Sequence, residues 1–182
     1  LNASGRLDTA KRALELLEAK ELREAMVLAE DLKVLNDSRK ELTEKGVKEA
    51  MDQIEASELK QDKVLVVYLP ECHESIAGII AGRIREHYSR PTLVLTKAET
   101  GVKGSGRSIE AYDMFAELNR CRDLFLKFGG HKMAAGVSLP EENVETLRKR
   151  LNENCILSWE DMAERIHIDM KLPFAYINEK LI

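Results

Sequence analysis

The sequence predicts an α/β fold with a mixed sheet flanked by helices and preceded by a long connecting helix. Three observations carry this prediction. Residues 8–62 contain no proline and are rich in Ala, Leu, Glu and Lys, residues 63–96 read as strand, helix and strand, and residues 101–156 continue to alternate short strands with helices. A strand–helix–strand unit implies a parallel pair of strands.

The first segment, residues 8–62, is expected to form one or two helices. Asp8 or Thr9 can cap its start. Residues 36–38 (Asn-Asp-Ser) and Gly46 are candidate breaks. Apolar residues recur at spacings that trace one stripe along the helix, namely Leu28, Leu32, Leu35, Leu42, Val47, Met51 and Ile54. Because heptads are not sustained, packing against a neighbour is favoured over a self-standing coiled coil.

Two apolar runs after this segment predict buried strands, KVLVVYL at residues 63–69 and TLVLT at residues 92–96. Between them, ESIAGIIAGRIREHY predicts a helix that ends before Pro91. One face of this helix carries Ile76, Ile79, Ile80 and Ile84.

Two features of this helix have both a structural and a functional interpretation. The Ala-Gly pairs at residues 77–78 and 81–82 either pack closely on a sheet or leave space for a ligand. His73 precedes the helix, where its ring can cap the first turn, or where free N–H groups can receive an anion. Capping is the favoured interpretation for His73.

The segment GVKGSGRSI, residues 101–109, predicts a third strand that carries polar chemistry. Gly104 and Gly106 would let the backbone approach a ligand and would expose N–H groups. Ser105 offers a hydroxyl, and Arg107 offers a forked donor suited to phosphate oxygens. A strand with a bulge and an exposed arginine explains the pattern equally well, so both interpretations stay open.

The stretch FGGHKMAAG, residues 128–136, follows AYDMFAELNRCRDLFLKF, which predicts one or two helices. Gly129 is expected to end the helix in the left-handed conformation. Gly130 would then turn the chain and hold His131 at the lip of the next strand, MAAGVSL. Residues 134–136 are small, so something bulky can lie against that strand. A helix cap followed by a tightly packed strand explains the glycines but leaves His131 without a role.

The remaining residues complete the expected pattern. Pro140 separates the MAAGVSL strand from an amphipathic helix, EENVETLRKRLNENC, and RIHIDMKL reads as a further strand. The basic residues are concentrated in the middle of the chain: residues 63–139 hold 11 Lys and Arg against 8 Asp and Glu, whereas the rest of the chain is acidic. A basic excess around the glycine motifs favours an anionic ligand.

Several classes of protein are excluded by what the sequence lacks. The 3 cysteines form no CxxC motif, which argues against a disulfide framework and against thiolate zinc. The 4 histidines have no metal-site spacing, and the sequence has no HExxH, DxD or DHH motif, so a self-contained metal hydrolase is not expected. No run of about 18 apolar residues could span a membrane, which favours a cytoplasmic location.

Taken in order, the motifs LNASGRL, CHESIAGIIAGRI, RPTLVL, KGSGRS and FGGHKMAAG resemble the RecJ family of single-strand-specific exonucleases, in which GGHKMAAG is the signature of the DHHA1 domain. The likeness covers essentially the whole chain. It implies the tail of a DHH catalytic domain at residues 1–7 and connecting helices at residues 8–62. A DHHA1 domain would follow at residues 63–156 and the start of an oligonucleotide-binding barrel at residues 157–182. The chain is therefore expected to be a piece of a longer protein.

The resemblance also implies an activity, the 5′–3′ degradation of single-stranded DNA in repair and recombination. In the family, Mn²⁺ or Mg²⁺ is held by Asp and His residues of the DHH domain. Those residues would precede Leu1, so neither a bound metal nor independent activity is expected in this chain. The implied partners are single-stranded DNA and the catalytic DHH domain of the same chain, with a single-strand-binding protein or a helicase as further candidates.

The site residues are carried over from the family motifs. Ser105 and Arg107 would hold the DNA backbone near the scissile phosphate, where an arginine neutralises charge. Further residues would line the same cleft or lie close to the active site, namely Gly129, Gly130 and His131 in the cleft and Arg6 near the active site. Cys72, Glu74 and Ser75 stand where RecJ proteins commonly have Trp, Pro and Gly.

Three other functions remain as alternatives. The chain could be a nucleic-acid-binding module of another DHHA1 protein, such as the terminal domain of an alanyl-tRNA synthetase. It could belong to a phosphodiesterase of the same superfamily that cleaves short oligonucleotides or cyclic dinucleotides. It could also be a helical scaffold in which residues 8–60 mediate dimerisation.

Overall fold

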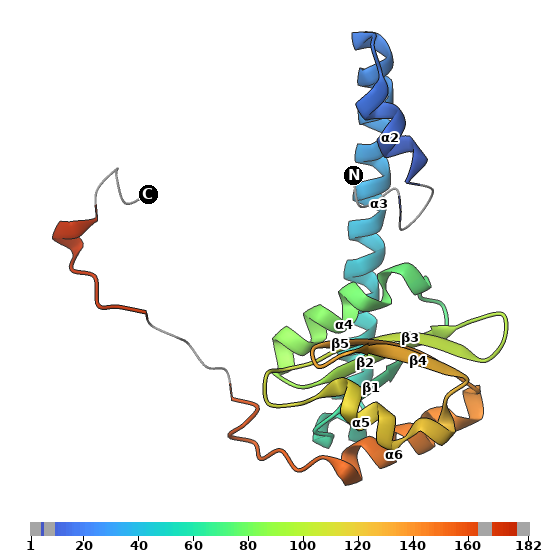
Figure 1. Cartoon of the computed structure of the whole chain (residues 1–182), viewed down its shortest axis with the longest axis vertical. Coiled ribbons are helices and arrows are strands. Elements are labelled where there is room, and N and C mark those ends of the chain that lie inside the picture. The colour runs from blue at the N-terminus through green and yellow to red at the C-terminus, as the bar shows by residue number, and fades with distance from the viewer. Residues whose placement is uncertain (1–4, 6–9, 164–168, 178–182) are drawn as a thin grey trace.

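The computed structural model describes residue 5 and residues 10–163 and 169–177, and its centre is a five-stranded mixed sheet in the order β1-β2-β3-β5-β4. Helix α4 covers one face of the sheet and helices α5 and α6 cover the other, while α3 extends away from it (Figure 1). The fold class predicted from the sequence is confirmed. In chain order the elements are α2 (Lys11–Glu18), α3 (Leu22–Glu55), η1 (Glu58–Gln61), β1 (Leu65–Tyr68), α4 (Glu74–Tyr88), β2 (Thr92–Lys97), β3 (Val102–Arg107), α5 (Met114–Arg120), η2 (Arg122–Leu124), β4 (Lys127–His131), β5 (Ala134–Leu139), η3 (Glu141–Asn143), α6 (Val144–Asn154) and η4 (Phe174–Tyr176).

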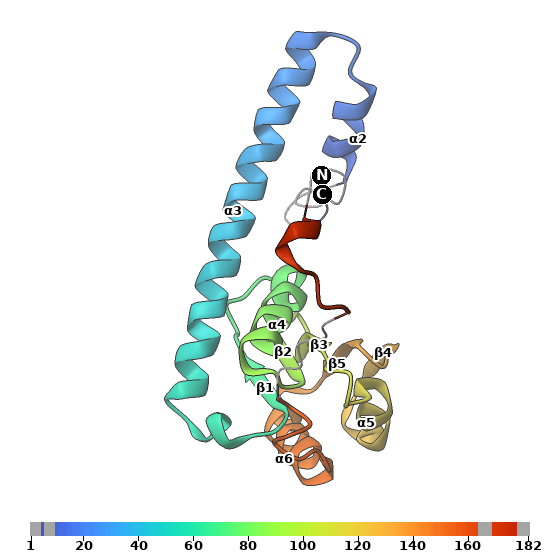
Figure 2. The same ribbon diagram turned by 90° about the vertical axis from the view of Figure 1, so that its left-hand side faces the viewer.

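The predicted connecting helix is a hairpin of two helices, in which α2 folds back along α3 (Figure 2). The chain turns at residues 19–21, so both candidate breaks were wrong. At residues 36–38 the polar side chains bond to the next turn, as Asp37 does to Lys40 at 3.2 Å, and the helix continues. Gly46 lies against α4, where an added Cβ would be 2.5 Å from Cδ1 of Ile80. It allows the two helices to approach and does not break α3.

The apolar stripe of α3 is only partly buried, and its end near the sheet packs in the core under α4. Leu32 and Ile54 are buried as expected, but Leu42 is 43% exposed, which corrects its place in the stripe. Its neighbour Thr43 takes the buried position, because the Thr43 hydroxyl donates to the Arg39 carbonyl oxygen at 2.7 Å and so needs no solvent. The helix start predicted at Asp8 or Thr9 lies outside the described residues.

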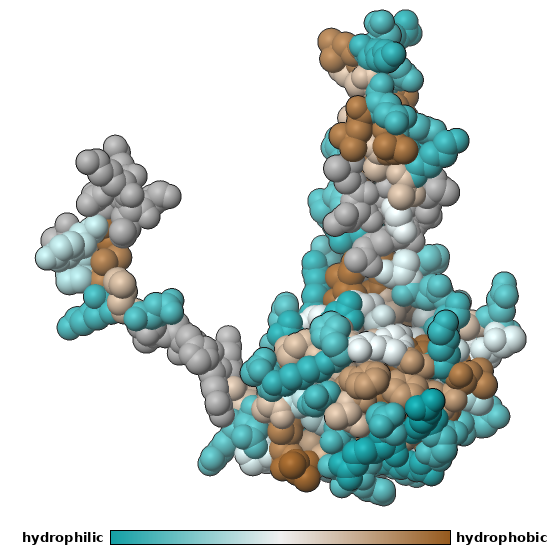
Figure 3. All heavy atoms as spheres, viewed as in Figure 1, coloured by the Kyte–Doolittle hydropathy of each residue, from teal (hydrophilic) through white to brown (hydrophobic). Residues whose placement is uncertain are grey.

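The far end of the α2–α3 hairpin exposes apolar side chains, which appear brown in Figure 3. They include Leu14, Leu17, Leu22, Met26 and Val27, all more than half exposed. Within residues 10–163 and 169–177, none of the helices combines the length and the apolar character needed to cross a membrane.

The β1–α4–β2 unit forms as the sequence predicted. Strands β1 and β2 are parallel, with Leu65 opposite Thr92, and Ala77 and Ala81 of α4 are buried against the sheet. His73 is the N-cap of α4, because its Nδ1 accepts the Ser75 backbone N–H at 3.3 Å. The capping interpretation of His73 is therefore confirmed.

The helix predicted up to Phe128 ends much earlier. Helix α5 stops at Arg120 and a short 3-10 turn follows, so that Phe128 and Gly129 lie in strand β4. Phe128 alternates to the core face, where its ring lies 5.1 Å from that of Phe125, and this packing favours a strand over a helix. Gly129 is thus not a helix cap.

Gly130 is also part of β4, and the chain turns later, between His131 and Ala134. Gly130 has a φ of +153°, and an added Cβ there would collide with the Ala134 carbonyl oxygen and lie 2.6 Å from the Ala135 Cα. Only glycine fits this position of the hairpin.

One side chain from α6 binds the backbone just before β1. Asn152 Oδ1 accepts the backbone N–H groups of Lys63 at 2.8 Å and Val64 at 3.0 Å, and its Nδ2 donates to the Val64 carbonyl oxygen at 2.9 Å. These bonds satisfy backbone groups that would otherwise lack a partner in the approach to the strand. Of the strand predicted for RIHIDMKL, residues 164–168 lie outside the described residues, and residues 169–172 form no strand.

Candidate nucleic-acid interface

The face of the sheet that looks toward α4 brings the two glycine motifs together. Alternation along β3 places Lys103, Ser105 and Arg107 on this face, and their directly paired neighbours on β5 and β4 share it. Three cross-strand rows result: the arginine row (Arg107, Ala134, His131), the glycine row (Ser105, Gly136, Gly129) and the lysine row (Lys103, Ser138, Lys127). We call these three rows together the row face.

A cavity of about 460 Å³ lies over the glycine and lysine rows. The start of α4, at Glu74 and Ser75, forms one wall, and Lys127 of β4 borders the opposite side. The floor is bare, because an added Cβ at Gly129 or Gly136 would have no atom within 4 Å. Of the small residues 134–136 that the sequence predicted to leave the strand bare, Gly136 does so, whereas Ala135 is buried on the opposite face of the sheet.

Gly104 and Gly106 do not act as predicted. An added Cβ at Gly104 would collide with the Val94 carbonyl oxygen, and one at Gly106 would lie 3.2 Å from Cε and Sδ of Met114. Both glycines thus serve the packing of the sheet. Because β3 lies between β2 and β5, its N–H groups are engaged in the two ladders and are not offered to a ligand.

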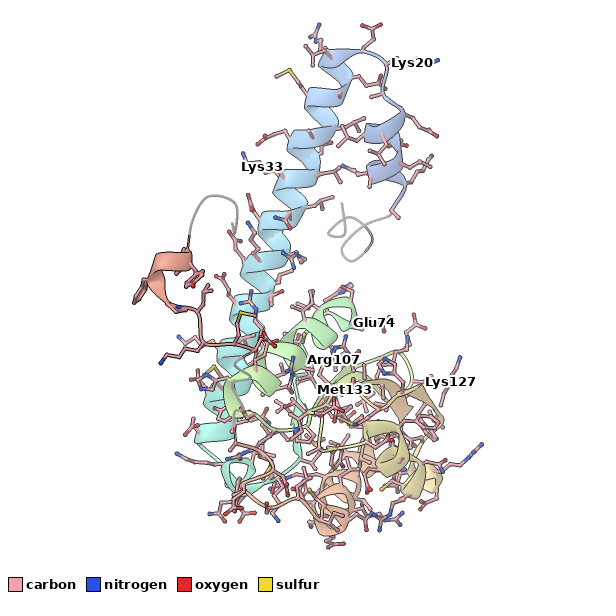
Figure 4. The ribbon with its side chains drawn as sticks, turned by 60° about the vertical axis from the view of Figure 1, so that its left-hand side comes forward. Lys20, Lys33, Glu74, Arg107, Lys127 and Met133 are labelled. Carbon is pink, nitrogen blue, oxygen red and sulfur yellow. The ribbon has the colours of Figure 1, made fainter. Side chains whose placement is uncertain are left out.

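Arg107 lies between β3 and α4 (Figure 4). Its Nη1 donates to the Gly106 carbonyl oxygen at 2.7 Å. A Cβ on Gly78 of α4 would lie 2.7 Å from the Arg107 Nη2 and 3.3 Å from the Ser105 Cβ. The missing side chain at Gly78 therefore makes room for the guanidinium. Sequence reasoning missed this role, although the small-residue spacing in α4 was its signal.

Gly82, one turn further along α4, has no such role. An added Cβ there would meet nothing within 4 Å. Of the two Ala-Gly pairs, Ala77 and Ala81 are both buried against the sheet, and only Gly78 touches the row face.

His131 is exposed at the end of the β4–β5 hairpin. Its Nδ1 accepts the Met133 backbone N–H at 3.3 Å, so in the neutral ring the proton is on Nε2, which can donate to a ligand. The hairpin turn is held in place by the rest of the domain. The Ser108 N–H donates to the Met133 carbonyl oxygen at 2.9 Å, and the Met114 N–H donates to that of Lys132 at 3.0 Å.

The polar groups of the row face differ in how far they are already paired. Lys103 forms an ion pair with Glu74 at 3.0 Å. Within the described part of the chain, Lys127 has no ion-pair partner and the hydroxyls of Ser105 and Ser138 have no hydrogen-bond partner. These three groups are available to an anionic ligand.

The site residues predicted from the sequence are placed as follows. Ser105, Arg107, Gly129 and His131 share the row face, whereas Gly130 pairs with Ala135 on the opposite face of the sheet, and Arg6 lies outside the described residues. Sequence reasoning left Lys103, Gly136 and Ser138 out of the site, because their place depends on the strand register.

The residues described here do not fit a metal centre. Among residues 10–163 and 169–177, no three His, Cys, Asp or Glu side chains come together in a way that could hold an ion. The row face therefore contains no cluster of metal ligands among the described residues.

Comparison with known proteins identifies the family. The family model of the DHHA1 domain matches residues 61–156. The single-stranded-DNA-specific exonuclease RecJ of Salmonella typhimurium is 41% identical over 171 residues, which cover 90% of this chain and 30% of that protein. RecJ of Bacillus subtilis is 39% identical over 155 residues, which cover 84% of this chain and 20% of that protein. The chain thus spans about a third or less of these relatives.

A solved structure supports the same assignment. The crystal structure of Thermus thermophilus RecJ in complex with Mn²⁺ superposes with a TM-score of 0.76 at 32% identity, over 84% of this chain and 22% of that one. A crystal structure of exonuclease RecJ bound to manganese gives a TM-score of 0.74 at 32% identity. The chain belongs to the DHHA1 domain family and is a homologue of the RecJ exonucleases.

Proposed function

We propose that this chain is the strand-holding part of a RecJ-like exonuclease and that the row face binds the phosphate backbone of single-stranded DNA. The observation that carries the proposal is the bare glycine row, which lies between two rows that end in basic side chains. A backbone can lie directly on this floor because no side chain stands in its way.

The chemistry of the rows suits phosphate. Arg107 presents a forked donor, which matches two oxygens of one phosphate. The Nε2–H of His131 and the Ser105 hydroxyl add further donors on the same face. Each of these groups donates a hydrogen bond, and a phosphate has oxygens that accept them.

Binding of this kind carries little sequence preference. Aromatic residues make up 5% of the chain, and Phe128, the aromatic residue nearest the glycine row in β4, turns toward the core face. Base stacking, the usual source of affinity in single-strand-binding proteins, is therefore minor here. Phosphate contacts dominate, and they make the affinity fall steeply with salt.

In this proposal the chain holds and orients the strand while hydrolysis takes place elsewhere. Residues 1–7 would continue a DHH catalytic domain and residues 157–182 would begin an oligonucleotide-binding barrel. The chain alone would bind single-stranded DNA without cleaving it. A place for Arg6 near the scissile phosphate stays a prediction.

The proposal is tested by titrating a fluorescent 5′-phosphorylated single-stranded 12-mer at several salt concentrations. Arg107→Ala is compared with wild type, and Arg23→Ala, an exposed arginine of α3, serves as the control. Loss of one phosphate contact makes the slope of log affinity against log salt shallower by about 0.7. Equal slopes and affinities for wild type and Arg107→Ala would contradict the proposal.

A further inference from the structure

The cavity on the row face is not centred on the arginine row. It lies over the glycine and lysine rows, and Arg107 and His131 are not part of its lining. Of the residues that the family motifs identify, Ser105 and Gly129 border the cavity, which extends beyond them to the lysine row.

We propose that the lysine row is a second phosphate-binding site, which rests on the proposed function and extends it from one anchor to two. Lys103, Ser138 and Lys127 lie side by side across three strands and border the cavity. The DNA strand would be held at both ends of the bare floor, and its middle would lie on the glycine row.

The distance between the two sites along β3 sets the length of single-stranded DNA that can reach both. Lys103 and Arg107 are four residues apart on β3, which is about 13 Å at the usual rise of a strand. A stacked single strand, at about 3.4 Å per nucleotide, covers this distance in about four nucleotides. A dinucleotide therefore reaches one site only, whereas an octamer reaches both.

The groups at the lysine row differ in their readiness to bind. Lys127 and the Ser138 hydroxyl have no partner among the described residues, so a phosphate displaces nothing when it binds them. Lys103 is paired with Glu74, but both side chains are about half exposed, at 52% and 55%. Exposed ion pairs are weak, and a phosphate can replace the Glu74 carboxylate as the partner of Lys103.

Glu74 is the acidic group of this site. Its carboxylate lies at the start of α4 on the wall of the cavity, and it both neutralises Lys103 and repels a phosphate. Removal of its charge in Glu74→Gln should therefore strengthen the binding of an octamer. The same change should leave the binding of a dinucleotide unaltered, because the dinucleotide occupies the arginine row.

The experiment compares 5′-phosphorylated thymidine octamer and dinucleotide on the whole chain, with fluorescence titration for the octamer and NMR shift titration for the dinucleotide. The variants are Lys127→Ala and Arg107→Ala. Lys20→Ala is the matched control, because Lys20 is also an exposed lysine without an ion-pair partner in the described part of the chain, at the opposite end of the molecule (Figure 4).

If the second site exists, Lys127→Ala weakens binding of the octamer several-fold and makes the slope of log affinity against log salt shallower by about 0.7. Binding of the dinucleotide is unchanged. Arg107→Ala should weaken the binding of both ligands. The second site is overturned if Lys127→Ala leaves the binding of the octamer unaffected, or weakens the binding of both ligands equally. If Arg107→Ala binds both ligands like wild type, the proposed arginine contact fails while the result for Lys127 still decides the second site. If wild type binds neither ligand, the proposed function and the second site fail together.

Discussion

The two halves of the sheet differ in what their side chains do. In β1 and β2 both faces are covered, and residues such as Leu65, Val67, Leu93 and Val94 are fully buried. In β3, β5 and β4 one face is packed against α5 and α6, and the other presents glycine, serine and basic side chains. Both halves contribute side chains to the core, but only the antiparallel half leaves part of one face uncovered.

The largest expected effect is on stability in the parallel half. Leu93→Ala removes a fully buried side chain from β2 and should lower the free energy of unfolding by about 2–5 kcal/mol. Gly136→Ala adds a methyl group where nothing lies within 4 Å and should change it by less than about 1 kcal/mol. Urea denaturation of both variants measures the difference. Similar losses for the two would break the comparison.

The next largest effect concerns the bonds between Asn152 and the backbone before β1. Asn152→Ala leaves two backbone N–H groups and one carbonyl oxygen of Lys63 and Val64 without their partner. The expected loss is about 1–3 kcal/mol in the free energy of unfolding, since unsatisfied polar groups cost that much. DNA binding at a temperature where the variant is folded should equal that of wild type. The control is Asn154→Ala at the end of α6, which removes only the bond that Arg120 donates at 3.4 Å.

A smaller effect separates two glycines of α4. Gly78→Ala should displace the Arg107 guanidinium and weaken DNA binding about three- to tenfold, which corresponds to roughly 1 kcal/mol. Gly82→Ala, which touches nothing, should bind like wild type. Both changes favour the helix, and Gly82→Ala should gain up to about 1 kcal/mol of stability. Equal binding by the two variants would show that Gly78 does not position Arg107.

The smallest effect concerns alkaline pH and belongs to the packed half. Burial, together with a hydrogen bond to Glu55, raises the pKa of Tyr88 to about 12. The folded state therefore holds this proton more tightly than the unfolded state, and the corresponding stability is complete below about pH 10 and falls as the pH rises toward 12. Tyr88→Phe should lose less stability between about pH 9 and about pH 12 than wild type, as measured by urea midpoints. An equal loss would assign the alkaline sensitivity to other groups.

The parallel half was also the half that the sequence predicted well. The runs KVLVVYL and TLVLT predict buried strands, and the isoleucine spacing in residues 74–88 predicts a helix. Accordingly, β1, α4 and β2 lie where they were expected. Local pattern and tertiary packing agree in these segments.

The antiparallel half was harder to predict because the local sequence does not show which face of the sheet each glycine occupies. Gly104 was expected to make space for a ligand and Gly129 to end a helix, yet Gly104 is required by its contact with β2 and Gly129 faces the open floor. Which side of the sheet a glycine faces depends on the register with β5, and that register is a tertiary property. The place of Lys127 beside Ser138 was not predicted for the same reason, since its segment was interpreted as the end of a helix.

We propose that single-stranded DNA binds to the row face and to no other surface of the domain. The most direct measurement is an NMR titration of the ¹⁵N-labelled chain with a 5′-phosphorylated thymidine octamer. We predict the largest amide shifts at Ser105, Lys127, Gly129 and Gly136, with β1 and β2 nearly unchanged. Shifts concentrated on the α2–α3 hairpin or on α6, with the row face unmoved, would contradict the account.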